Sequence, residues 1–272
     1  LATHLNAEET SSEDLPGLWG LRLVAFGQSF PAYPSSSEQN LTVLPIPYPV
    51  YRGKILRFGE DLDTIANGQL VKGNRTKLSL GLSASFPENS DNLSGRGGMP
   101  DLDLLVEAGP ELKLTLSGSP EDDREFLLSL QVRGAVSMDG FDATGRGFVF
   151  KPELEYLYRH FVDSKTELRL RVSPTWATSN YANYFYGVDP EFATPDRPSF
   201  DAASGYLNTE FLLGLNRRIT NRLEFRGSIR LWANRGSVNN SSPLYQRDYD
   251  RGIRLALFWT VWESKQRTTT RN

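Results

Sequence analysis

Residues 222–233 read RLEFRGSIRLWA, and apolar and polar residues alternate along this stretch. The apolar positions are Leu223, Phe225, Ile229 and Leu231. The polar positions are Arg222, Glu224, Arg226, Ser228 and Arg230. A period of two residues is typical of a β-strand with two different faces. The stretch therefore predicts a strand that turns apolar side chains to one side and charged side chains to the other.

The same alternation recurs along most of the chain. It is found in residues 76–86, 104–117, 125–138, 148–161, 166–178, 207–217 and 248–262. Most of these runs exceed the five or six residues usual in soluble domains and reach the roughly nine to eleven that a tilted membrane-crossing strand needs. The longest apolar stretches, such as residues 255–259, are far shorter than the roughly 20 residues of a transmembrane helix. Strand length therefore favours a β-barrel in a membrane.

The connections between these runs alternate in length. Tight turns are expected at residues 72–74, 162–165 and 219–221, and longer polar segments at residues 87–101, 139–147, 179–205 and 236–247. Outer-membrane barrels have short turns at one rim and long extracellular loops at the other. Rings near strand ends, such as Trp176, Trp259 and Trp262, fit an interfacial girdle. The alternative is that these rings form the core of a soluble β protein.

The N-terminal third is less regular. Residues 41–51 carry Pro45, Pro47 and Pro49, and because proline removes a donor from the ladder, irregular pairing is expected there. Adding residues 18–26, 41–51 and a short pair at 54–59 and 65–71 brings the count to about twelve strands, or ten if the short pair lies outside the wall.

The predicted fold is therefore all-β, a closed antiparallel transmembrane β-barrel of about twelve strands. The barrel is expected to span residues 16–262, between a polar N-terminal tail at residues 1–15 and a polar C-terminal tail at residues 263–272. The N-terminus has no basic start and no apolar core, so a mature chain without its signal peptide is expected.

Composition excludes several classes of function. The chain has 30 basic and 33 acidic residues and a net charge of −3, so no basic surplus points to nucleic acid as a partner. It has no Cys and only 2 His, which argues against disulfide frameworks, thiol nucleophiles and Cys or His zinc sites. We expect no cofactor and no metal.

The polar faces of the strands are expected to point into the barrel and form a charge network in the lumen. Its candidate members carry both signs of charge: Glu107, Glu111, Lys113, Arg133, Lys151, Glu153, Glu155, Arg169, Arg171, Glu210, Arg222, Glu224, Arg226 and Arg230. One interpretation is a packed interior in which buried charges pair with one another. The other is a narrow pore whose charges select a small polar or ionic solute.

The segment 179–205 is rich in aromatic residues and is expected to be an extracellular loop. The candidate residues of this loop are Tyr181, Tyr184, Phe185, Tyr186 and Asp189.

Catalysis is not expected. Glu153 and Glu155 lie at i and i+2, as two carboxylates on one face of a strand would. Basic neighbours on the same face keep such carboxylates ionised, whereas a general acid needs a raised pKa. His160 is the one His within the predicted barrel, and it is expected at the rim with the tight turns, away from any cleft formed by the long loops. The chain is therefore predicted not to be an enzyme.

Several short motifs resemble the MipA/OmpV family of outer-membrane proteins. They are GMPDL at residues 98–102, VEAGP at 106–110, YFYGVD at 184–189 and SPL at 242–244, preceded by PAY at 31–33 and the apolar run 45–51 that ends in Arg-Gly. Their order also matches, and the similarity spans roughly residues 16–262. Two features depart from the family pattern: Pro34 stands where a small residue is expected, and a polar tail replaces a terminal aromatic residue.

The resemblance implies a non-enzymatic protein of the bacterial outer membrane, surrounded by outer-membrane lipid. The member that gave the family its name resembles a scaffold protein: it links a lytic murein transglycosylase to a bifunctional penicillin-binding synthase. The leading hypothesis is thus an envelope scaffold, and the alternative is a narrow channel or solute-binding barrel for small polar or ionic compounds.

Overall fold

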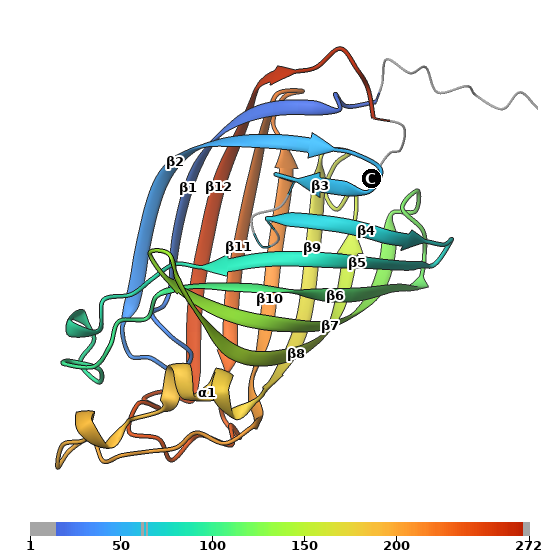
Figure 1. The fold of residues 1–272 in the computed structure, drawn as a ribbon. Coiled ribbons are helices and arrows are strands. Elements are labelled where there is room, and N and C mark those ends of the chain that lie inside the picture. Colours follow the sequence, from blue (N-terminus) through green and yellow to red (C-terminus); the bar gives the residue numbers. More distant parts are fainter. Residues whose placement is uncertain (1–14, 61–62, 64, 269–272) are drawn as a thin grey trace, which may run out of the picture.

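Twelve β-strands form a closed antiparallel barrel in the computed structural model, which describes residues 15–60, 63 and 65–268. Each strand pairs with its neighbours in the chain, and β1 closes the wall by pairing with β12 (Figure 1). The predicted fold class is confirmed, and the short pair belongs to the wall. Within the described residues, no helix is long and apolar enough to cross a membrane.

The strands are β1 (Trp19–Pro31), β2 (Gln39–Arg52), β3 (Leu56–Phe58), β4 (Ala66–Lys72), β5 (Thr76–Ser85), β6 (Leu104–Ser117), β7 (Arg124–Asp139), β8 (Asp142–Tyr158), β9 (Thr166–Ala177), β10 (Gly205–Arg218), β11 (Leu223–Ala233) and β12 (Tyr249–Glu263). The helical segments are α1 (Ser179–Tyr186) and the 3-10 turns η2 (Ser90–Asn92) and η3 (Pro190–Phe192).

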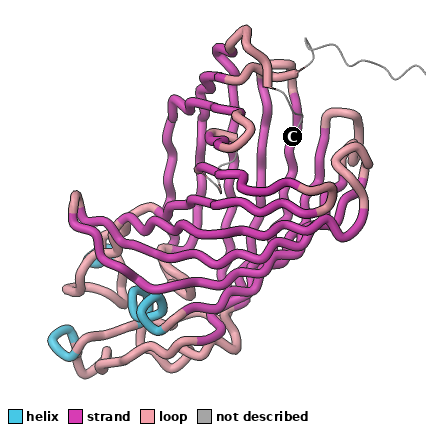
Figure 2. Tube along the Cα trace, turned by 45° about the vertical axis from the view of Figure 1, so that its right-hand side comes forward, coloured by secondary structure: helices cyan, strands magenta, loops and turns pink. Residues whose placement is uncertain are grey.

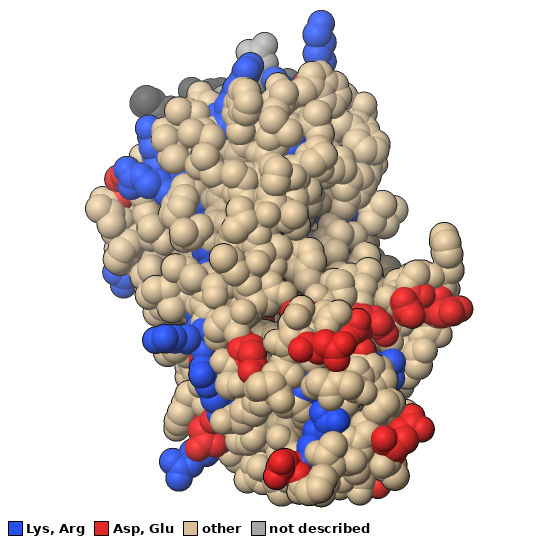
Figure 3. Space-filling model, turned by 90° about the vertical axis from the view of Figure 1, so that its left-hand side faces the viewer, with Lys and Arg blue, Asp and Glu red and all other residues tan. Residues whose placement is uncertain are grey.

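The alternation in sequence becomes an inner and an outer face of the wall. In β7, Glu125, Gln131 and Arg133 are buried inside, whereas Phe126 and Val132 are exposed outside. Figure 3 shows a broad area without charged side chains on the outer surface. A transmembrane barrel presents an apolar outer band to lipid. Its backbone tolerates the lipid because the polar groups of a closed wall pair within it.

The two ends of the barrel differ. The turn rim comprises the start of β1, the end of β12 and the short connections 53–55, 73–75, 118–123, 159–165 and 219–222. The loop cap comprises the connections 32–38, 86–103, 178–204 and 234–248, and in Figure 2 the helices lie among these loops. The predicted alternation of short and long connections is thus present, with one exception.

The exception is the segment 139–147, which was predicted as a long loop. It is a tight hairpin, because β7 continues to Asp139 and β8 starts at Asp142. The register shifts between Ala135 and Val136 of β7, which pair with Gly147 and Gly145 and leave one extra residue in β8. Gly147 has a φ of 84°, which is the conformation that a bulge of this kind requires of glycine. Gly145 and Gly147 therefore belong to a bulge inside the hairpin, and Gly140, with a φ of 59°, lies in its turn.

The prolines of β2 do not disturb its pairing with β1, so the expectation of irregular pairing was wrong on that side. The β1–β2 register runs without a shift. The amide of Arg52 donates to the carbonyl of Leu18 at 2.8 Å, so even-numbered residues of β2 face β1 in the alternating ladder. Pro45, Pro47 and Pro49 are odd-numbered and face the other edge, where β2 pairs with β3 at only two positions.

Candidate functional site

A cavity of about 1300 Å³ lies inside the barrel. At one end its lining includes residues of the turn rim, such as Gly73, Asn74 and Pro120. At the other end it reaches the loop cap at Tyr33 and Tyr184. The cavity therefore extends along the barrel from the turn rim to the cap.

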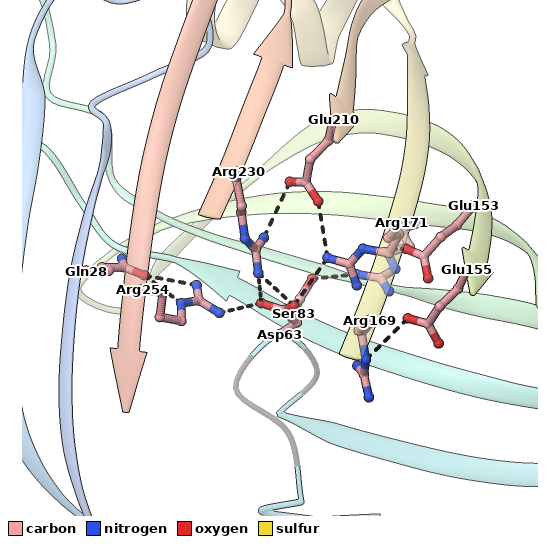
Figure 4. Close-up of polar contacts among 11 residues, drawn as sticks. Gln28, Asp63, Ser83, Glu153, Glu155, Arg169, Arg171, Glu210, Arg230 and Arg254 are labelled. Atoms are coloured by element: carbon pink, nitrogen blue, oxygen red, sulfur yellow. Dashed lines mark hydrogen bonds and ion pairs between the residues drawn. The ribbon is translucent and has the colours of Figure 1, made fainter. Parts of the chain in front are cut away.

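Asp63 lies at the centre of the charged wall of this cavity. It comes from the segment between β3 and β4, and arginines of β9, β11 and β12 point toward it (Figure 4). Arg230 donates to both carboxylate oxygens at 2.7 and 2.8 Å, Arg171 approaches Oδ2 at 3.3 Å, and Arg254 also donates to Oδ1. Both bonds of Arg230 come from its Nη2 atom, and each is charge-assisted because donor and acceptor are ionised. Asp63 thus joins three strands of the wall.

Glu210 adds a second carboxylate to the same group. Its two oxygens lie 3.1 Å from Arg171 and 3.4 Å from Arg230. Arg171 also lies 3.5 Å from Glu153. Only 4% of the Glu210 side chain and 9% of the Arg230 side chain are exposed, and charges this buried are tolerated only when they are paired. We call Asp63, Glu153, Glu210, Arg171, Arg230 and Arg254 the Asp63 cluster.

The electrostatics of the cluster keep Asp63 ionised. Burial by itself would raise the pKa of Asp63, but Arg230, Arg254 and Arg171 outweigh it and hold the pKa well below its ordinary value. The carboxylate is therefore charged at any physiological pH, and so are the arginines around it.

The candidate residues of the lumen network fall into several groups. Glu153, Arg171, Glu210 and Arg230 belong to the Asp63 cluster, and Arg169 lies beside it, 3.7 Å from Glu155. Separate pairs join Glu224 to Arg226 at 2.7 Å and Glu111 to Lys113 at 3.7 Å. Glu107 accepts a hydrogen bond from Tyr181 at 2.7 Å, Arg133 donates to Ser83 at 2.7 Å, and Lys151 lines the cavity. The role of these residues stays a prediction.

Arg222 was placed in the lumen network incorrectly. It has the right parity for the inner face but precedes β11, and its side chain is exposed at the turn rim. The alternating pattern predicts which face of the strand a residue lies on, but it does not predict at which residue the strand begins or ends.

Sequence reasoning missed Asp63 and Arg254. The alternation of residues 248–262 puts Arg254 on the inner face together with Asp250, so the signal for Arg254 was present. Asp63 lies outside any strand, and no periodicity could place its side chain.

The aromatic segment predicted to be an extracellular loop lies in the loop cap, with α1 packed against the other long connections. Tyr181, Tyr184, Phe185 and Tyr186 lie in α1 and are buried, whereas Asp189 is exposed. Their position on the extracellular side stays a prediction. The four aromatic residues pack with residues from every long connection, including Tyr33, Leu93, Leu102, Val188 and Leu244.

Polar contacts hold the cap in place as well. Tyr184 donates to the carbonyl of Asp103 at 2.8 Å, and the buried guanidinium of Arg96 donates to the carbonyl of Phe185 at 3.3 Å. Burial raises the pKa of Tyr33 and of Tyr184 to about 12. The loop cap is thus a packed layer over one end of the cavity.

Among residues 15–60, 63 and 65–268, no three or more His, Asp or Glu side chains are grouped as a metal site requires.

Comparison with known proteins gives one match along nearly the whole chain. The family described as "MltA-interacting protein MipA" matches residues 23–261. No curated protein sequence matches the chain significantly.

Three solved structures illustrate its structural similarities. The chain is similar to the NanC porin, with 11% identity, 88% of this chain and 98% of that chain covered, and a TM-score of 0.41. It is similar to a bacterial polysaccharide outer membrane secretin, with 9% identity, coverages of 92% and 100%, and a TM-score of 0.45. It is also similar to outer-membrane expressed OmpT of Vibrio cholerae, with 11% identity, coverages of 89% and 77%, and a TM-score of 0.39.

Proposed function

This chain belongs to the MltA-interacting protein MipA family, and from that premise we propose that it is a non-enzymatic outer-membrane scaffold that holds a murein transglycosylase at its turn rim. A penicillin-binding synthase is the second partner of the proposed assembly. In the same proposal the apolar outer band lies in outer-membrane lipid.

Orientation decides which end can reach murein. Outer-membrane barrels place short turns in the periplasm and long loops outside the cell. By this rule the turn rim is periplasmic and the loop cap is extracellular. A partner that works on murein would therefore meet the turn rim.

The single observation that supports a partner at this rim is its charge. Exposed basic residues surround much of it: Lys54, Lys72, Arg75, Lys165, Arg217, Arg218, Arg222, Lys265 and Arg267. Acidic residues gather at one turn, where Glu121, Asp122 and Asp123 are exposed. Separated patches of opposite sign steer and orient a partner of complementary charge. We infer that the transglycosylase presents an acidic surface to the basic part of the rim.

The experiment is binding of a purified murein transglycosylase to the detergent-solubilised barrel, measured by surface plasmon resonance. In the test variant, Lys165, Arg218 and Arg222 are each replaced by Glu. None of the three has a side-chain ion pair among the described residues, so the barrel should keep its stability. We expect the association rate to fall on the order of tenfold at low salt, and the difference to shrink as salt rises.

The matched control carries the same three charge reversals on the loop cap side, at Arg235, Arg247 and Arg251, which are also exposed. It should bind as the wild type does. Equal losses in both variants, or no binding by the wild type, would refute the scaffold proposal.

The cavity favours a second candidate function, a solute-binding barrel. Its volume of about 1300 Å³ is large enough for a small-molecule ligand, and its walls carry paired charges of both signs. Planar-bilayer recording tests the related idea of a channel. No current in the wild type, or a current unchanged by Arg226→Ala and Arg230→Ala, argues against a pore lined by these residues.

A further inference from the structure

The wall of the barrel is incompletely paired between β2 and β5. β2 pairs with β3 only at Tyr51 and Arg52, and β4 follows β5 only as far as Leu82. Among the described residues, no strand pairs with residues 39–50 of β2 on this edge, or with residues 83–85 of β5 on the edge facing β2. In Figure 1 the long part of β2 diverges from the ends of β3, β4 and β5. Thr42 and Tyr48 of β2 and Ser83 and Ser85 of β5 line the cavity from both sides of this gap. We call the unpaired part of the wall between these two edges the lateral window.

The edge of β2 is adapted to remain unpaired. Pro45, Pro47 and Pro49 face the window and carry no N–H donor. An unsatisfied donor at an edge facing hydrocarbon costs several kcal/mol. Prolines at three successive window-facing positions remove this cost at those positions and prevent another strand from pairing there, whereas Leu41 and Val43 on the same edge keep their N–H groups.

Both ends of the window are closed by specific contacts. At the turn rim, Gly59 packs against the backbone of Pro49, where a Cβ would come within 2.1 Å of the carbonyl oxygen. At the loop end, the side chain of Asn40 donates to Glu88. The window is therefore a bounded opening, which distinguishes it from a frayed edge.

An apolar wall lies directly inside the window. Phe26, Ile46 and Tyr48 line the cavity. Phe26 is part of a buried cluster with Val24, Ala256 and Phe258, against which Tyr48 packs. The ring of Phe86, which follows β5, lies 6.5 Å from the ring of Phe26. An aliphatic chain that entered here would contact carbon on both sides.

A cation lies beside this wall on the β5 side. Arg133 extends from β7 across β6 to donate to Ser83 of β5 at 2.7 Å. Gly109 and Gly81 pair opposite each other in its path, and the Arg133 guanidinium lies 3.6 Å from where a Cβ of Gly81 would be. The Nε atom of Arg133 is buried without a hydrogen-bond partner. Glu111 Oε2 lies 3.8 Å from the same Gly81 Cβ position. Two glycines thus clear a path for a buried guanidinium that Ser83 holds and that forms no ion pair within 4.0 Å among the described residues.

We propose that the lateral window admits a fatty-acyl carboxylate from the bilayer and that Arg133 binds its carboxylate. The acyl chain lies against Phe26, Ile46 and Tyr48, and the carboxylate completes the hydrogen bonding of the guanidinium. One cavity thus contains the proline edge of β2, the apolar surface around Phe26 and the guanidinium of Arg133, which forms no ion pair among the described residues. It does not depend on the scaffold proposal.

The test uses the whole chain in a non-ionic detergent with 11-dansylamino-undecanoic acid as the fluorescent probe and unlabelled decanoate as the competitor. Arg133→Gln should weaken probe binding roughly tenfold or more, because a charge-assisted bond is lost. Arg133→Lys should retain part of the affinity. Arg251→Gln, which removes an exposed arginine from the outer face, is the matched control and should bind like the wild type.

Competitors separate the acyl chain from the charge. Decanoate should displace the probe, whereas decanol and acetate, which each lack one half of the ligand, should not. A heat-modifiability gel checks that each variant is folded, and if Arg133→Gln is not, Gly81→Leu displaces the guanidinium without removing it and should weaken binding as well. Unchanged binding by a folded Arg133→Gln or Gly81→Leu variant, or displacement by decanol or acetate equal to that by decanoate, would overturn the proposal.

Discussion

Replacement of Asp63 by Asn tests whether the Asp63 cluster holds the barrel together. The substitution keeps the shape of the side chain and removes the negative charge that faces Arg171, Arg230 and Arg254. These arginines lie on β9, β11 and β12, so the carboxylate connects three strands to a segment between β3 and β4. We expect loss of global stability rather than local rearrangement.

The magnitude follows from burial and from the partners that remain. Removing one member of a buried ion pair typically costs about 3–5 kcal/mol. Asp63 keeps 27% of its side chain exposed, and Arg171 and Arg230 retain Glu210. The expected loss therefore lies at or just below the lower limit of this range, about 2–3 kcal/mol.

The assay is equilibrium unfolding by urea in lipid vesicles, followed by the fluorescence of the 5 tryptophans. The control is Asp163→Asn, which removes a carboxylate 2.9 Å from Arg217 at the turn rim. The side chain of Asp163 is 40% exposed and that of Arg217 is 46% exposed. An ion pair this exposed contributes little to stability because water screens it, so the control should stay close to the wild type. Equal effects of the two substitutions would refute the assignment of a structural role to the cluster.

The pH dependence gives a second check on Asp63. A carboxylate whose pKa is lowered by folding contributes stability above its unfolded pKa of about 3.9, and loses that contribution as the pH falls through the folded value. The difference in unfolding free energy between wild type and Asp63→Asn should therefore be constant above about pH 5 and shrink in more acidic solution. A difference that grows on acidification would contradict the lowered pKa.

Two further substitutions test the window and the cap. Gly59→Ala should destabilise the barrel by about 2 kcal/mol in the same urea assay, because Gly59 has a φ of 75° and a Cβ there would meet the carbonyl of Pro49; an unchanged midpoint would mean that this end of the window is not closed as described. Tyr184→Phe removes the hydrogen bond to Asp103 and should cost about 1 kcal/mol. Spectrophotometric titration of the wild type and this variant should differ by one tyrosine that ionises near pH 12, and a difference near pH 10 would contradict its burial.

The sequence by itself determined the strands and the faces of the barrel. In 222–233 and its counterparts, a period of two records which side chains face outward and which face the lumen, since neighbouring residues of a strand point to opposite sides. The inward position of Arg226 and Arg230 and the number of strands followed from this local property. The departures came where turn chemistry was misread, as in the hairpin at residues 139–147, where glycines belong to a bulge.

Only the tertiary structure decided what the inward side chains meet. Asp63 contacts Arg171, Arg230 and Arg254 across sequence separations of 108, 167 and 191 residues, and no local pattern encodes such a meeting. The same holds for the aromatic residues of α1, which could have been an exposed loop but pack under the connections of other hairpins. The prolines of β2 were visible from the start, but their effect depends on which edge they face and on the strand that lies beyond it, and closure of the barrel sets both.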